Sequence, residues 1–75
     1  MEAQEFKLLV NKDTIFIHKE KGHTYKVLDL LRFKHPDTGE WYDGVLYTQL
    51  ESGELFVRSE ESFVENFIVI NFKNK

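Results

Sequence analysis

The sequence predicts a small, strongly bent all-β barrel of five or six short strands with one short helical turn. Three observations lead to this expectation. Turn-forming residues recur at short intervals, the segments between them are rich in β-branched and aromatic residues, and those segments alternate in polarity as strands do. Short strands and tight turns within 75 residues favour a bent barrel over a flat sheet with open edges. We therefore treat the chain as a single domain.

The expected strands are separated by turns, of which the sequence His35-Pro36-Asp37-Thr38-Gly39 is the most specific. Pro36 presets the backbone angle of the first central position, and Gly39 can adopt the left-handed conformation that closes a hairpin. The other expected turns are Asn11–Asp13, Lys19–Gly22 and Glu51–Glu54, and the expected strands are Thr14–His18, Thr24–Lys34, Trp41–Leu50, Leu55–Arg58 and Phe67–Phe72.

Two strands carry irregularities. In the second strand Asp29 interrupts the apolar alternation and Leu28 interrupts the polar one, which predicts a bend or bulge. In the third strand both faces carry apolar groups, and Gly44 is a plausible corner where the chain turns around the barrel.

Helical structure is expected at one place and left open at another. Ser59 resembles a helix cap followed by early carboxylates, with Phe63 pointing inward, and only a short turn fits before Asn66. Residues 1–13 form either an additional strand or a short helix, and we regard them as an extension to a core of about residues 14–70.

Several stretches of the chain together form a recognisable pattern. They are Phe16–Lys19, Gly22–Leu28, His35, Thr38, Gly39, Glu40, Val45, Tyr47, Leu55, Val57, Arg58 and Phe63. These residues resemble a small bacterial and phage domain, the domain-of-unknown-function family sixteen-fifty-three. The chain departs from the family by an extra Glu20-Lys21, by Phe56 where a Trp is usual, and by Ser59 where a Pro is usual. This resemblance implies an SH3-like barrel and implies no particular activity, cofactor or partner.

Composition excludes several classes of protein. Ten Lys and Arg against thirteen Asp and Glu leave a net charge of -3, and the absence of cysteine excludes disulfides, thiolate catalysis and cysteine-based zinc sites. Apolar runs such as Phe67–Ile70 are far shorter than the roughly 20 residues of a membrane-spanning helix. The first residues lack the basic and apolar regions of a signal peptide, so we expect a cytoplasmic protein without membrane contact.

The residues that could carry chemistry fit no catalytic or metal-binding pattern. His18, His23 and His35 match no recognised ligand spacing. Asp37 and Asp43 lie near His35, but carboxylates are expected in such a turn for local hydrogen bonding. No nucleophile motif or phosphate-binding glycine loop is present. We expect no enzyme activity, no metal and no cofactor.

The leading functional expectation is a non-enzymatic binding module for a protein partner, which contacts it through the hairpin from His35 to Asp43. Trp41 and Tyr42 point to opposite faces of a strand, so at least one of them should reach solvent unless both rings complete the core. Arg58 either pairs with a carboxylate such as Glu40 or Asp29, or receives a carboxylate or phosphate of a ligand. The predicted contact residues are His35, Glu40, Trp41, Tyr42 and Arg58.

Two alternatives remain open. Residues 1–35 hold seven Lys or Arg against five acids, whereas residues 36–75 hold three against eight. A basic strip with interleaved aromatics could bind nucleic acid, and its candidate members are Lys19, Lys21, Lys26, Arg32 and Lys34. Alternatively, His and Arg side chains could converge on a small anionic ligand between subunits of a homo-oligomer.

Protonation of His35 should strengthen the binding of an anionic partner below about pH 7.5, unless this histidine only caps its turn or packs on Trp41.

Overall fold

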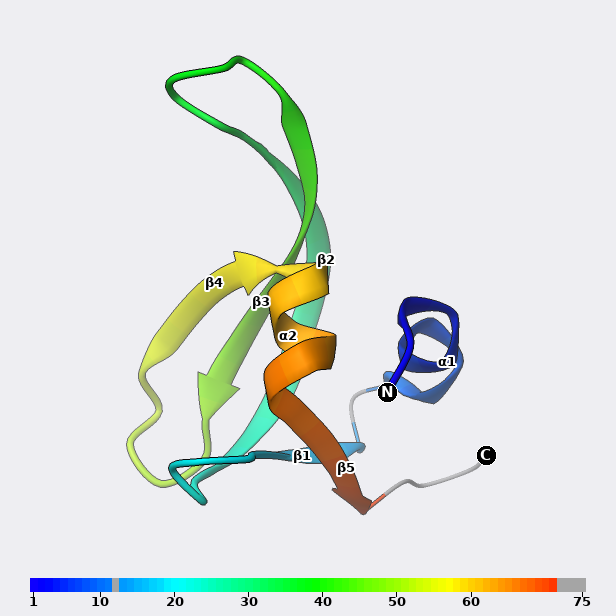
Figure 1. Cartoon of the computed structure of the whole chain (residues 1–75). Coiled ribbons are helices and arrows are strands. Elements are labelled where there is room, and N and C mark those ends of the chain that lie inside the picture. The colour runs from blue at the N-terminus through cyan, green and yellow to red at the C-terminus, as the bar shows by residue number, and fades with distance from the viewer. Residues whose placement is uncertain (12, 72–75) are drawn as a thin grey trace.

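The computed structural model describes residues 1–11 and 13–71, and a five-stranded antiparallel sheet with two short helices makes up most of it (Figure 1). This confirms the all-β character of the fold. Two residues of the predicted elements lie outside the described residues. They are Lys12, in the expected turn Asn11–Asp13, and Phe72, at the end of the expected strand Phe67–Phe72. The elements in chain order are α1 (Ala3–Leu9), β1 (Ile15–His18), β2 (Thr24–Lys34), β3 (Trp41–Gln49), β4 (Leu55–Ser59), α2 (Glu60–Asn66) and β5 (Phe67–Asn71).

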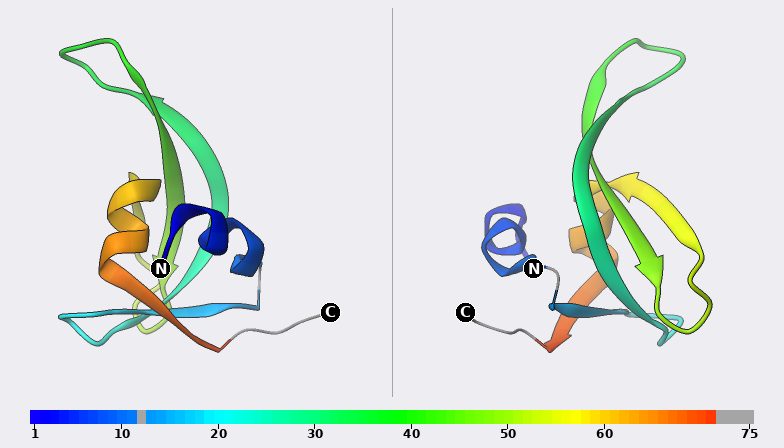
Figure 2. Two further views of the ribbon diagram at one scale, coloured as in Figure 1. Left: turned by 45° about the vertical axis from the view of Figure 1, so that its right-hand side comes forward. Right: turned by 180° about the vertical axis from the view of Figure 1, so that it is seen from behind.

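The sheet curls but does not close into a barrel. Its strand order is β4-β3-β2-β1-β5, so β4 and β5 are the two edges and do not pair with each other. Helix α2 connects these two edge strands and packs against β3, β4 and β5. Figure 2 shows both helices on the concave side of the sheet. Side chains of the helices, rather than a closing strand ladder, therefore cover the core on this side.

The irregularity expected in β2 is present. Val27 lies opposite Tyr47 and Leu30 lies opposite Val45, with a register shift between Val27 and Asp29. Residues directly opposite in an antiparallel pair share a face, so Leu30 lies on the same face as Val27 although it is three positions further along the strand. The bulge thus exchanges the two faces of β2 along its length.

The core is mainly aromatic, and its centre is the pair Phe63 and Phe67. These rings stack with centroids 4.1 Å apart and an interplanar angle of 2°. Tyr47 meets both rings edge-on at 5.2 and 5.4 Å. The buried apolar residues are Phe6, Phe16, Tyr25, Val27, Val45, Tyr47, Phe63, Val64 and Phe67.

Residues 1–13, which the sequence left open between strand and helix, include a helix that completes this core. Phe6 of α1 is fully buried, and its ring centroid lies 5.8 Å from Phe16 and 5.3 Å from Phe63. The hydroxyl of buried Thr14 donates to the carbonyl of Leu9 at 2.7 Å and satisfies the end of the helix. Helix α1 therefore contributes Phe6 to the core.

The helix expected after β4 is also present, and it is longer than a single turn. Ser59 caps it, because its hydroxyl accepts a hydrogen bond from the backbone N–H of Ser62 at 3.1 Å. Phe63 points into the core as predicted.

We predict that Phe6→Ala lowers the free energy of unfolding by about 3 to 5 kcal/mol, because it leaves a cavity among packed rings. Leu8→Ala in the same helix is the matched control: Leu8 is 82% exposed, so the change should stay within about 0.5 kcal/mol. Urea denaturation followed by circular dichroism measures both. Equal effects of the two substitutions would show that α1 does not dock on the core in solution.

Candidate functional site

The end of the β2–β3 hairpin projects beyond the rest of the sheet. Ser59, the last residue of β4, lies opposite Gly44, and β3 extends outward from there to Trp41. Residues Trp41–Asp43 therefore pair with β2 on one side and with no strand of the described chain on the other. Figure 1 shows this projecting part, which we call the distal hairpin (residues 31–43).

An open cavity of about 900 Å³ lies between the distal hairpin and the start of α2, and we call it the hairpin groove. One wall is aromatic and consists of Phe33, His35 and Tyr42. The Tyr42 ring lies 5.8 Å from Phe33 and 5.9 Å from His35, so the three rings form a continuous surface. The groove thus contains His35, Tyr42 and Arg58, three of the five predicted contact residues.

The remaining lining of the groove is mostly acidic. Glu2, Asp43, Glu60 and Glu61 contribute carboxylates, and Arg58 contributes the only guanidinium of the described lining. Glu60 is buried and its Oε1 lies 3.9 Å from Nζ of Lys7, so this carboxylate is partly neutralised. The excess of carboxylates favours a cationic group in the groove.

Among the described residues Arg58 forms no pair with a carboxylate, so the suggested pairing with Glu40 or Asp29 is wrong. Instead, its Nε donates to the Tyr47 hydroxyl at 2.8 Å and its Nη1 donates to Oγ of Ser62 at 3.1 Å. Its guanidinium lies 5.0 Å from the centroid of the Phe67 ring. These contacts fix the guanidinium at the rim of the aromatic core.

The other two predicted contact residues lie apart from the groove lining. Trp41 is 56% exposed, so it does not complete the core. It lies on the opposite face of the distal hairpin, where Arg32 and Lys34 are 5.6 and 6.0 Å from its ring. Oε1 of Glu40 accepts a weak hydrogen bond of 3.4 Å from the Tyr42 hydroxyl. We call Arg32, Lys34 and Trp41 the basic face of the hairpin.

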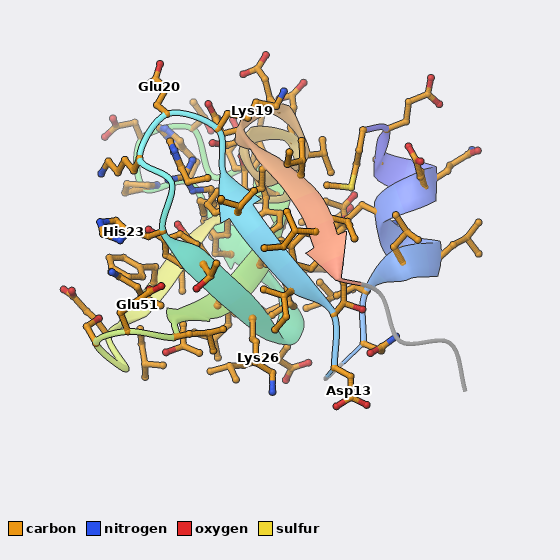
Figure 3. All side chains as sticks on the ribbon, turned by 90° about the horizontal axis from the view of Figure 1, so that it is seen from below. Asp13, Lys19, Glu20, His23, Lys26 and Glu51 are labelled. Carbon is orange, nitrogen blue, oxygen red and sulfur yellow. The ribbon has the colours of Figure 1, made fainter. Side chains whose placement is uncertain are left out.

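The five residues predicted as one basic strip do not form a strip. Lys19 and Lys21 lie in the β1–β2 turn, at the opposite end of β2 from Arg32 and Lys34. The bulge places Lys26 on the other face of β2 from Arg32 and Lys34, and Figure 3 shows Lys19 and Lys26 on opposite sides of the molecule. Sequence alternation alone could not reveal this, because it assumes an unbroken register.

His18 and His35 each cap the turn that they begin. Nδ1 of His18 accepts from the backbone N–H of Glu20 and of Lys21, both at 3.2 Å. Nδ1 of His35 accepts in the same way, at 3.2 and 3.4 Å, from residues 37 and 38. In both turns the His lies four residues before a Gly of positive φ, Gly22 or Gly39, and this repeated spacing is the sequence signal for the shared capping role. The capping alternative for His35 is therefore what the structure shows, although its ring contacts Tyr42 rather than Trp41.

Comparisons with protein-family models, curated proteins and solved structures find no match for this chain. Within residues 1–11 and 13–71, no group of three or more His, Asp or Glu side chains is arranged to hold a metal ion. Neither described helix has the length and apolar character needed to cross a membrane.

We predict that the stability of the protein falls as the pH drops below about 6.5 because of His18. Burial first, and then the charges of Arg58 and Lys21, hold the pKa of His18 below its ordinary value of 6.5. The unfolded chain therefore takes up this proton at a higher pH than the folded chain, so acidification favours unfolding until the folded-state pKa is reached.

The measurement is the free energy of unfolding in urea between about pH 7.5 and pH 5. His18→Asn retains an acceptor near Nδ1 and should remove this part of the pH dependence. His23→Asn, at an exposed position of the same turn region, should leave it intact. A pH dependence that survives in His18→Asn would contradict the assignment.

Proposed function

We propose that this chain is a non-enzymatic protein-interaction module that binds an extended peptide in the hairpin groove. We further propose that it is an SH3-like domain of bacterial or phage origin, as the family resemblance implies. The strand order, the bulged β2 that pairs with both β1 and β3, and the helix between the last two strands support that assignment. The lack of cysteine in so small a domain supports a cytoplasmic location.

The observation that carries the proposal is the position of the hairpin groove beside an unpaired strand edge. The backbone groups of Trp41–Asp43 on that edge can pair with an added extended segment. The aromatic wall of Phe33, His35 and Tyr42 offers a surface for an apolar side chain of the same peptide. The carboxylates of the groove favour a neighbouring Lys or Arg.

The hydrogen bonds of the two serine hydroxyls in the groove support the proposal that the protein is not an enzyme. Ser59 accepts from the backbone of Ser62 as a helix cap, and the Ser62 hydroxyl accepts from Arg58. Among the described residues neither hydroxyl is hydrogen-bonded to a histidine or carboxylate that could remove its proton. Both groups therefore have structural roles.

We predict that peptides selected by this protein from a random phage-displayed library combine a basic residue with an aromatic or aliphatic one. Tyr42→Ala should weaken the binding of a synthetic selected peptide about tenfold or more, because it removes the centre of the aromatic wall. Isothermal titration calorimetry measures the affinity.

The matched control is Trp41→Ala, which removes the adjacent exposed aromatic from the opposite face and should leave peptide affinity unchanged. Circular dichroism verifies that both variants are folded. If selection enriches no common pattern, or if both substitutions weaken binding equally, the groove is not the peptide site.

A second candidate function, binding of single-stranded nucleic acid, rests on the basic face of the hairpin. Trp41 is exposed and has two cationic side chains, Arg32 and Lys34, within 6.0 Å of its ring. An exposed ring beside cations is the arrangement on which bases stack while phosphates are neutralised. Asp43, opposite Arg32 in the register, reduces the positive charge of this face.

If this face binds nucleic acid, a fluorescein-labelled oligothymidylate should bind weakly at low salt. We expect a log–log dependence on salt with a slope of about -1.4, which corresponds to two neutralised phosphates. Trp41→Ala should weaken this binding and Tyr42→Ala should not, the reverse of the pattern for the peptide. Fluorescence anisotropy measures both affinities. If the protein does not bind the oligonucleotide even at low ionic strength, the nucleic-acid function is excluded.

A further inference from the structure

A second cavity, of about 340 Å³, is also bordered by Arg58, and we call it the turn pocket. The β1–β2 turn region contributes His18, Lys21 and His23 to its lining, and the sheet contributes Tyr25, Phe56 and Arg58. The sequence suggested that His and Arg side chains could converge between two subunits. In the structure they converge within one chain.

Several hydrogen-bond donors of the turn pocket have no partner in the described chain. Because Nδ1 of His18 accepts two backbone hydrogen bonds, the proton of the neutral ring is on Nε2, and no described group bonds that atom. No described group bonds the Tyr25 hydroxyl either. Since no buried side-chain nitrogen or oxygen of the described residues lacks a partner, both atoms are open to solvent. Arg58 uses two of its five N–H groups, which leaves three available.

The charged groups around the pocket favour an anion. Lys21 and Arg58 line it as cations, and Glu54 is the carboxylate in the described lining. Glu20 lies in the same turn but points away from the fold (Figure 3). Glu51 lies outside the lining, where its Oε2 accepts the Thr24 hydroxyl at 2.6 Å, and its charge helps to raise the pKa of Tyr25 after the larger effect of burial. Burial is the main cause of the lowered pKa of His18; the charges of Arg58 and Lys21 lower it further, and the charge of Glu20 raises it.

We propose that the turn pocket binds a small phosphomonoester. Arg58, Lys21 and the Nε2–H of His18 would donate to the phosphate oxygens, and the organic group would lie against the half-buried ring of Phe56. A phosphate presents three outer oxygens to donors that approach from separate directions, whereas a carboxylate presents two in one plane. The donors here come from β1, from the turn and from β4, which fits the tetrahedral group.

The best variant for a test is Lys21→Gln, since Arg58 also holds Tyr47 and Ser62 and its loss would disturb the fold. Lys19→Gln is the matched control. Both lysines are exposed in the same turn and each substitution removes one positive charge, but only Lys21 lines the pocket.

The experiment titrates the full chain with phenyl phosphate, with inorganic phosphate and with phenylacetate at constant ionic strength. Nitrogen–proton correlation spectra of the histidine rings report on Nε2 of His18. We expect a saturable shift of that nitrogen with phenyl phosphate, tighter binding than with inorganic phosphate, and weaker binding of phenylacetate. Lys21→Gln should weaken phenyl phosphate binding about tenfold, and Lys19→Gln by less than about twofold.

The absence of a saturable shift with either phosphate would overturn the proposal. Equal losses in Lys21→Gln and Lys19→Gln would also overturn it, because they would indicate general attraction of anions to the turn. Phenylacetate binding as tightly as phenyl phosphate would exclude selectivity for the phosphate group. None of these measurements depends on the hairpin groove, which the pocket meets only at Arg58.

Discussion

The parallel stack of Phe63 on Phe67 is the contact on which the rest of the fold depends. One ring comes from α2 and the other from β5, so the stack holds the helix that links the two open edges of the sheet. Phe6 and Phe16 pack against Phe63, and Tyr47 meets both rings. A chain of this size with no disulfide must bury large side chains to offset its conformational entropy. Here aromatic rings from five elements share one centre.

The same stack determines where the binding surfaces lie. Phe67 is the ring beneath the guanidinium of Arg58, and Tyr47 accepts its Nε–H. Arg58 therefore stays at the rim of the core with three N–H groups available, between the hairpin groove and the turn pocket. The two cavities thus share one cation whose position the core controls.

The bulge in β2 has a comparable influence on the distal hairpin. At the hairpin end the register pairs Lys34 with Trp41 and Phe33 with Tyr42, which groups Arg32, Lys34 and Trp41 on one face, and the bulge separates this part of β2 from Lys26. One face of the hairpin is consequently basic, and the other forms the aromatic wall of the groove. Without the shift Lys26 would share a face with Arg32 and Lys34, and the charges would run along the whole strand. One extra residue in β2 therefore separates Lys26 from the basic face of the hairpin.

By itself the sequence determined the local features. These are the turns that end at Gly22 and Gly39, the irregularity near Asp29 and the cap at Ser59, because each depends on groups within about four residues. It also identified Tyr42, His35 and Arg58 as residues of interest, which the structure brings to one groove. Only the tertiary structure decided that residues 1–13 contain a helix, since burial of Phe6 needs Phe16 and Phe63. It also decided that the basic strip is divided, that the sheet stays open and that His18 faces Arg58. Those outcomes depend on contacts between residues far apart in the chain, to which local patterns are insensitive.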